Sequence, residues 1–335
     1  MPHASLVIPT RNRAPALART LAALTAQTEP RFEVIIADDG SDDDTAAVVR
    51  AWAPRLDLRY LRRGHRGIAA ARAAAMRAAQ ADVLIQTDDD RLPAPAFVAE
   101  HVAAHADPAA PRVVAGTTRG VLAHWSAAAG LPAAAVATVV ARDPALAARL
   151  AAPDVELATP AMLADDLPGT LARIVVDEPW WVATAAPLIA RYGADLAGFA
   201  FPWIVAIGGN TSVPRALAER IGFLDEDFVG WGLEDTDFHF RLCQAGATVH
   251  ALAGGLSYHQ LHARGPDLGR QWTRNAHRLI HKHASLALST YVTAVRRGQP
   301  LAEASDLVAA LALAPPAARA EVLRCHRELL AAALG

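Results

Sequence analysis

The feature that most constrains the fold is an alternation of short apolar runs and helical patterns across residues 1–90. Strand-like apolar runs end at Pro9, Ala37 and Thr87. Between the first two of these runs, Leu17 and Leu21 recur at helical spacing. Near-continuous apolar strands that alternate with helices are typical of a mainly parallel sheet covered by helices on both faces. The sequence therefore predicts an α/β fold.

Charged and polar residues follow these strands directly. The three segments are 10–13 (Thr-Arg-Asn-Arg), 38–39 (Asp-Asp) and 88–90 (Asp-Asp-Asp). The carboxyl ends of parallel strands meet at one edge of a sheet, and ligands of open α/β sheets bind at that edge. We therefore expect the three segments to form one site.

The composition narrows the class of protein. With 335 residues, 53% of them hydrophobic, the chain has ample material for a buried core and no case for wholesale disorder. Its 32 Lys and Arg against 34 Asp and Glu give a net charge of -2, so no global basic field is available to hold nucleic acid. The two cysteines, Cys243 and Cys325, exclude a disulfide scaffold and a cysteine-based zinc site. Arg11 and Arg13 interrupt the first apolar stretch and the uncharged runs are short, so we expect a cytoplasmic chain without an integral membrane segment.

The acidic triplet is a candidate metal site. Side chains two residues apart point to the same side of a strand, so we expect Asp88 and Asp90 to share a cleft while Asp89 faces away. Two converging carboxylates favour a bound Mg²⁺ or Mn²⁺ that also holds substrate phosphates. A solvated acidic turn before the next helix is an equally open interpretation.

The acidic pair Asp38-Asp39 is a candidate nucleoside site. A carboxylate at a strand end can accept hydrogen bonds from a nucleobase or from ribose hydroxyls, and Arg66 or Arg72 would offset phosphate charge. The alternative is an Asx turn that caps the following helix, and this alternative accounts for only one of the two acids.

The string 230–237 (Gly-Trp-Gly-Leu-Glu-Asp-Thr-Asp) is the most specific in the chain. Its two glycines permit a sharp turn that exposes Trp231, and Glu234 and Asp235 then begin a helix. Helix capping explains one such acid but not three, and the helix dipole favours an ionised carboxylate that can act as a base. Further on, His259 would complete a Mn²⁺ shell if Asp90 is a ligand, although a structural histidine is the commoner case.

Together these residues resemble the family 2 glycosyltransferases with the GT-A fold. The strings that match are 6–10 with Asn12, 34–41, Gly67 with 71–72, and 87–90 as the DxD signature. Residues 207–259 resemble the C-terminal half of chondroitin-polymerase and β-1,4-galactosyltransferase-like members, through Gly208-Gly209-Asn210, 230–235 and His259. Ala73 departs from the family, which often has asparagine there, as does a long Ala-rich middle segment.

The resemblance implies a nucleotide-sugar donor, usually UDP-linked, and inversion at the anomeric carbon. It implies Asp235 as general base, with Glu234 orienting hydroxyl groups of the acceptor or donor. It also implies a divalent Mn²⁺ or Mg²⁺ held by Asp90 and His259, with Asp88 as a further ligand, as a partner of the ligands, or oriented toward the ribose. The residues expected at the donor are Pro9, Thr10, Arg13, Asp38, Asp39, Arg72, Asp88, Asp89, Asn210 and Trp231. The polar stretch 262–270 is a candidate lid.

The sequence also predicts a division of the chain into four parts. These are a nucleotide-sugar-binding half (1–115), a helical insertion on the acceptor side (116–204), a catalytic and acceptor half (205–269) and a helical C-terminal extension (270–335). The acceptor is a saccharide, a peptide or a natural product. Two alternatives stay open: a sugar-phosphate nucleotidyltransferase, although 9–13 lacks the lysine and glycine of a phosphate loop, and a catalytically silent carbohydrate-binding protein of the same fold.

Overall fold

The computed structural model describes residues 2–127, 131, 133–263 and 265–332. The strands are β1 (Ala4–Thr10), β2 (Phe32–Asp38), β3 (Leu58–Arg62), β4 (Val83–Thr87), β5 (Arg91–Pro93), β6 (Arg112–Ala115), β7 (Thr118–Val121), β8 (His124–Ser126), β9 (Asp154–Glu156), β10 (Val175–Val176), β11 (Asn210–Pro214), β12 (Thr248–Ala251) and β13 (Ser257–Gln260). The helices of the first two thirds are α1 (Ala14–Leu24), α2 (Thr45–Trp52), α3 (Ile68–Ala78), α4 (Phe97–Ala103), α5 (Ala133–Arg142), α6 (Leu146–Leu150), α7 (Pro160–Asp165), α8 (Leu167–Ile174), the π-helix η2 (Trp181–Ala185), α9 (Ala186–Tyr192), the 3₁₀ helix η3 (Pro202–Ile204) and α10 (Arg215–Arg220). The last third adds α11 (Glu234–Gln244), α12 (Leu268–His283), α13 (Leu286–Arg297), α14 (Leu301–Ala312) and α15 (Pro316–Ala332).

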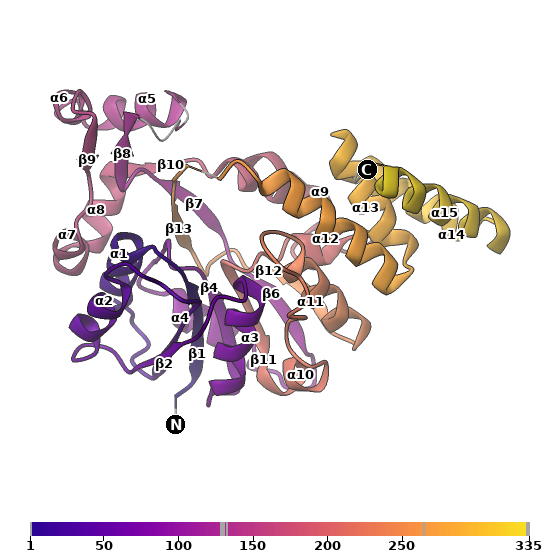
Figure 1. Ribbon diagram of the computed structural model, residues 1–335, viewed down its shortest axis with the longest axis horizontal. Helices are drawn as coiled ribbons and strands as arrows, with labels where there is room; N and C mark the ends of the chain where they lie inside the picture. The colour runs from indigo at the N-terminus through magenta and orange to yellow at the C-terminus, as the bar shows by residue number, and fades with distance from the viewer. Residues whose placement is uncertain (1, 128–130, 132, 264, 333–335) are drawn as a thin grey trace.

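A seven-stranded sheet forms the centre of the molecule, in the order β12-β6-β11-β4-β1-β2-β3 (Figure 1). β1 runs parallel to both β2 and β4, and β11 is antiparallel to its two neighbours. The register pairs Thr10 with Asp38, so the polar ends of β1 and β2 lie side by side. The predicted mainly parallel α/β fold is confirmed.

Apolar side chains on both faces hold this sheet between helices. Along β1, Leu6 and Ile8 belong to a cluster with Leu17 and Leu21 of α1, whereas Val7 belongs to the cluster on the opposite face. This alternation follows from the period of two along a strand. The sheet is therefore buried on both faces, and its carboxyl edge is left for a site.

A second, four-stranded sheet was not predicted, and it changes the interpretation of the acidic triplet. Its order is β10-β7-β13-β5, and β5 begins directly after Asp90. The chain therefore leaves the central sheet at Thr87, turns through 88–90 and enters the small sheet at Arg91. The triplet is a turn between two sheets, so the expected strand-like alternation of Asp88, Asp89 and Asp90 is wrong.

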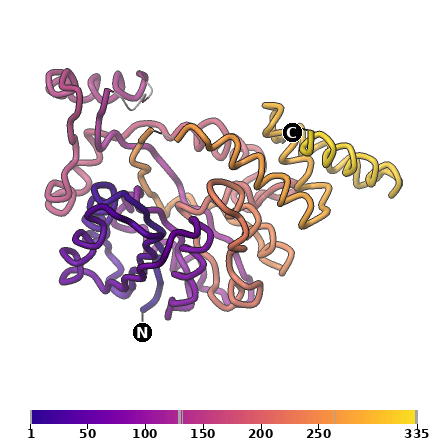
Figure 2. The backbone as a smooth tube through the Cα atoms, viewed as in Figure 1, coloured from indigo at the N-terminus to yellow at the C-terminus, as the bar shows by residue number. Residues whose placement is uncertain are grey.

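The middle of the chain forms a lobe beside the first half, and the last helices form an arm on the other side (Figure 2). The lobe has its own apolar cluster, which includes Leu122, Leu163 and Leu171, and it also supplies β7 and β10 to the second sheet. The four-part division of the chain stays a prediction. Among the described residues, no helix combines the length and the apolar character that crossing a membrane requires.

Candidate functional site

A cleft of about 810 Å³ lies at the carboxyl ends of β1 and β4, next to the start of α11 and the end of β13. Segments that are far apart in the sequence line it, among them Pro9, Thr10, Asp39, the acidic triplet and the string 230–236. The volume is in the range typical of small-molecule sites. The sequence therefore predicted correctly that the strand ends gather at one place.

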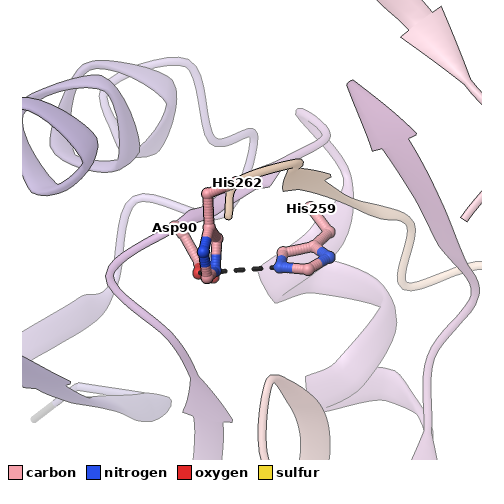
Figure 3. A group of neighbouring side chains, drawn as sticks. All are labelled: Asp90, His259 and His262. Atoms are coloured by element: carbon pink, nitrogen blue, oxygen red, sulfur yellow. Dashed lines mark ion pairs between the residues drawn. The ribbon is translucent and has the colours of Figure 1, made fainter. Parts of the chain in front are cut away.

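Three side chains in this cleft form a candidate metal centre: Asp90, His259 and His262, each with a ligand atom within 4.8 Å of the others (Figure 3). The Nε2 atoms of His262 and His259 lie 3.2 Å and 3.6 Å from Oδ2 of Asp90. Asp90 comes from the turn after β4, His259 from β13, and His262 from the loop that follows β13. One carboxylate with two imidazoles is a donor set that suits Mn²⁺.

The neighbouring cationic groups keep the Asp90 carboxyl group of this centre ionised. Although burial raises it, the pKa of Asp90 is held well below its usual value by His259, His262 and Arg13. Burial lowers the pKa of His259, as does Arg91, but the carboxylates of Asp90 and Glu178 raise it above the ordinary value overall. A divalent cation would replace the protons and the guanidinium that balance Asp90 here.

Asp88 and Asp89 lie outside this three-residue group. Asp88 was expected at the metal, but its carboxylate forms a 2.6 Å ion pair with Arg72. Asp89 was expected to face away, but it lines the cleft, accepts a 2.7 Å hydrogen bond from Thr10 and lies 3.2 Å from Arg13. Burial, opposed by Arg13, raises the pKa of Asp89 to about 7. Both differences follow from the turn, which rotates the three side chains toward different neighbours.

Arg72 lines the cleft, and its buried guanidinium forms ion pairs with two acids there. Its side chain lies 2.6 Å from Asp88 and 3.7 Å from Glu234. A Cβ atom on Gly208 would lie 2.6 Å from its Nη1, so a larger residue there would push the guanidinium aside. Arg72 therefore joins the acidic turn to the start of α11.

The two acids after β2 have different roles. Asp38 accepts hydrogen bonds from the Ser41 backbone N–H at 2.8 Å and from the Tyr60 hydroxyl, and it does not line the cleft formed by the described residues. Asp39 lines the cleft, and its carboxylate accepts backbone N–H groups of Arg66 and Gly67. The Asx-turn interpretation therefore describes Asp38, whereas Asp39 lines the cleft and its nucleoside contact stays a prediction.

Asn210 also lies outside the cleft, and this placement does not support its predicted contact with the donor. Its side chain is completely buried, donates to the backbone oxygens of Thr117 and Gly255, and its Oδ1 lies 2.9 Å from His101 Nε2. Because its amide is used on both sides, it holds the loops around β11 together.

The acids at the start of α11 separate into two environments. Asp235 is half-buried in the cleft, and its two carboxylate oxygens accept the backbone N–H groups of Gly208 at 3.1 Å and Thr236 at 2.7 Å. Glu234 is buried, and this burial together with the neighbouring Asp235 raises its pKa to about 7. The pKa of Glu234 is therefore raised, although it lies at a helix start.

The turn before α11 depends on its glycines. Gly230 and Gly232 have φ angles of 83° and 96°, and a Cβ on Gly230 would lie 2.7 Å from Gln271 of α12. The same Gln271 side chain accepts a 2.7 Å hydrogen bond from the Trp231 backbone. Trp231 is 41% exposed and lines the cleft, as the sequence predicted.

Several lining residues were missed by sequence reasoning: Glu178, Arg91, His65 and His262 as a metal ligand. For His262 the sequence held a signal of metal binding, because His259 and His262 are only three residues apart. The sequence pattern nevertheless placed His262 only in the candidate lid. Residue 264 of that lid lies outside the described residues. Arg91 is buried in the cleft with Nε and Nη1 without a hydrogen-bond partner among the described residues. Two free N–H donors of this kind fit an anionic ligand such as a diphosphate.

Comparisons with known proteins indicate the family to which parts of this chain are similar. Residues 5–126 match the family profile described as Glycosyl transferase family 2, and residues 191–263 match the one described as N-terminal domain of galactosyltransferase. The chain is 32% identical to a validoxylamine A glucosyltransferase of Streptomyces hygroscopicus subsp. jinggangensis. The alignment covers 89% of this chain and 65% of that enzyme. Residues 5–126 form a glycosyltransferase family 2 region. The chain spans just under two thirds of that relative's length.

Two solved structures bear on the fold of this chain. A mannosyltransferase of Pyrobaculum calidifontis, solved with GDP-Man and Mn²⁺, aligns with a TM-score of 0.54 and 22% identity, over 99% of this chain and 76% of its own. S. aureus TarS 1-349, solved with UDP, aligns with a TM-score of 0.50 and 17% identity, over 88% and 71%. At these identities they establish the GT-A fold alone. A chondroitin synthase of Pasteurella multocida is 27% identical over 76% of this chain and 24% of its own length.

Proposed function

We propose that this chain is a metal-dependent, inverting glycosyltransferase that moves a sugar from a UDP-linked donor to an acceptor hydroxyl. The observation that carries the proposal is the group of Asp90, His259 and His262, which shares one cleft with Asp39 and Asp235. Such a cleft offers a cation site, a nucleoside site and a base together. The comparisons do not favour either alternative, the nucleotidyltransferase or the silent binding protein.

In the proposed reaction, the bond between the anomeric carbon and the diphosphate breaks as the acceptor oxygen bonds to the opposite face of that carbon. Asp235 accepts the proton of the acceptor hydroxyl, held in orientation by the two backbone N–H groups that it binds. Glu234 orients hydroxyl groups beside it. A bound Mn²⁺ or Mg²⁺ would neutralise the charge on the departing diphosphate, and Arg91 would donate N–H groups to the same oxygens.

The acceptor wall of the cleft is formed by the insertion and the C-terminal helices. Trp180 and Thr184 come from the segment that includes η2, and Tyr291, Val295 and Leu301 come from α13 and α14. None of these five side chains carries a positive charge, whereas the neighbouring Glu234 and Asp235 are acids. We therefore propose an acceptor that presents ring or apolar faces and no anionic groups, which fits a neutral saccharide or a natural product.

The proposed donor and cation are tested by thermal unfolding with UDP, with and without Mn²⁺. We expect UDP to raise the melting temperature only when Mn²⁺ is present, because the diphosphate and the ion bind as one unit. At a hundredfold excess over Kd, binding stabilises the folded state by about 2.7 kcal/mol, which corresponds to a shift of several degrees. His262→Gln should lose this shift, and the surface variant Asp306→Asn is the control. A response to UTP alone would instead favour nucleotidyl transfer, and an equal response to UDP without metal would contradict metal dependence.

A further inference from the structure

Glu178 connects the insertion to the candidate metal centre. It lies between β10 and η2, only 5% exposed, and lines the cleft. Its Oε1 lies 3.5 Å from Nδ1 of His259, and its Oε2 accepts a 2.8 Å hydrogen bond from the Trp181 backbone N–H. Both oxygens of the carboxylate therefore have a defined neighbour.

The imidazole of His259 is held between two carboxylates. Its Nε2 faces Asp90 at 3.6 Å and its Nδ1 faces Glu178 at 3.5 Å. An imidazole binds a metal through one nitrogen, and the partner of its other nitrogen fixes the tautomer and the orientation of the ring. Nδ1 has no hydrogen-bond partner among the described residues, and at 3.5 Å the Glu178 carboxylate is placed to become one, which leaves Nε2 for the metal.

The backbone places Glu178 at this distance through Gly120 of β7. In the small sheet, Gly120 pairs with His259 on one side and with Val176 on the other. A Cβ on Gly120 would lie 3.0 Å from the Asp177 carbonyl oxygen and 3.0 Å from the Val176 side chain. Glycine here lets the segment that carries Glu178 pass close to β13.

We propose that Glu178 is a positioning residue for the cation: it accepts the Nδ1–H of His259 and thereby aims Nε2 at the ion. This inference rests on the proposed function, because it requires a metal at Asp90, His259 and His262. It gives the insertion a role in the metal centre. Glu178 acts through His259 and does not itself contact the ion or the substrate.

Glu178→Gln is the direct test, because an amide has one acceptor oxygen where a carboxylate has two. The variant cannot accept from both the His259 ring and the Trp181 N–H, so the ring loses its fixed orientation. We expect the Kd of Mn²⁺, measured by electron paramagnetic resonance in the presence of UDP, to rise about 10- to 100-fold. Activity at low Mn²⁺ should fall and should recover when Mn²⁺ is raised.

A matched control is Glu33→Gln, which removes another buried carboxylate, on β2. Glu33 accepts hydrogen bonds from the Ser5 hydroxyl at 2.6 Å and from the Gln80 backbone N–H at 2.7 Å. This variant should leave the Mn²⁺ Kd unchanged. An unchanged Kd in Glu178→Gln overturns the inference, and an increased acceptor KM in its place would make Glu178 an acceptor-binding residue. If the wild-type protein binds no Mn²⁺, the proposed function fails and the inference fails with it. If Glu178→Gln does not fold, Glu178→Asp is measured against the same criteria.

Discussion

Replacing Asp235 with asparagine is expected to abolish sugar transfer while the affinity for UDP and Mn²⁺ stays at the wild-type level. The substitution keeps the size and the contact with the Gly208 N–H, but an amide cannot accept the proton of the acceptor hydroxyl. Loss of a general base typically costs about 10²–10⁴-fold in rate. The measurement is kcat for release of UDP in the presence of acceptor, together with Kd for UDP and Mn²⁺ by calorimetry.

The control for this variant is Glu234→Gln, which removes the neighbouring carboxylate. Glu234 is buried against Arg72, so its loss should change kcat less than the loss of Asp235. Two findings would exclude Asp235 as the base: turnover retained in Asp235→Asn, or a loss of turnover that arises only because the donor no longer binds.

Of the substitutions named for this protein, Asp237→Asn should cause the largest decrease in the free energy of unfolding. Asp237 is completely buried and accepts 2.8 Å contacts from Arg241 and Lys282 and a 2.6 Å contact from His283. Removing one partner of a buried ionic network leaves the other charges uncompensated and costs about 3–5 kcal/mol. We expect urea denaturation to show a decrease of this size in the free energy of unfolding. The exposed pair Arg191–Asp306 supplies the control, because Asp306→Asn should cost about 1 kcal/mol or less.

The contribution of Asp237 should depend on pH in a defined direction. Burial raises its pKa, but His283, Arg241 and Lys282 lower it overall to about 2 in the folded protein, below its ordinary value of 3.8. A lowered folded-state pKa stabilises the protein above pH 4 and loses that effect as the pH falls toward 2. The difference in unfolding free energy between wild type and Asp237→Asn should therefore shrink across this range. A difference that is constant with pH would show that the carboxylate charge is not the cause.

The first half of the fold could be predicted because its signals are local. Leu6, Val7 and Ile8 form an unbroken apolar run, which a strand buried on both faces requires, and the acids that follow such strands must reach the same edge. The second sheet could not be predicted, because β5 and β13 are short and pair across more than 160 residues of sequence. The predicted side-chain directions of Asp88 and Asp89 were wrong for this reason.

A residue's place in the site could be predicted where that residue type seldom has a purely structural role. It could not be predicted where structural and ligand-binding roles are equally common. Asp90 was assigned by its position after a strand and His259 by the family resemblance, and they do meet in one cleft. Asn210 follows two glycines beside the cleft, but its amide satisfies buried backbone groups, which no sequence pattern distinguishes from ligand binding. Glu178 lies in an Ala-rich segment without a motif, and only the pairing of β7 with β10 and β13 brings it to His259.

The central claim is that segments distant in the chain meet around one cation that holds a diphosphate. Crystals grown with Mn²⁺ and UDP, measured at a wavelength where manganese scatters anomalously, test it most directly. The account predicts one strong anomalous peak between Asp90, His259 and His262, with the oxygens of the diphosphate bound to the same ion. A diphosphate bound in the cleft with no peak at these three side chains, or a peak at a different place, would contradict it.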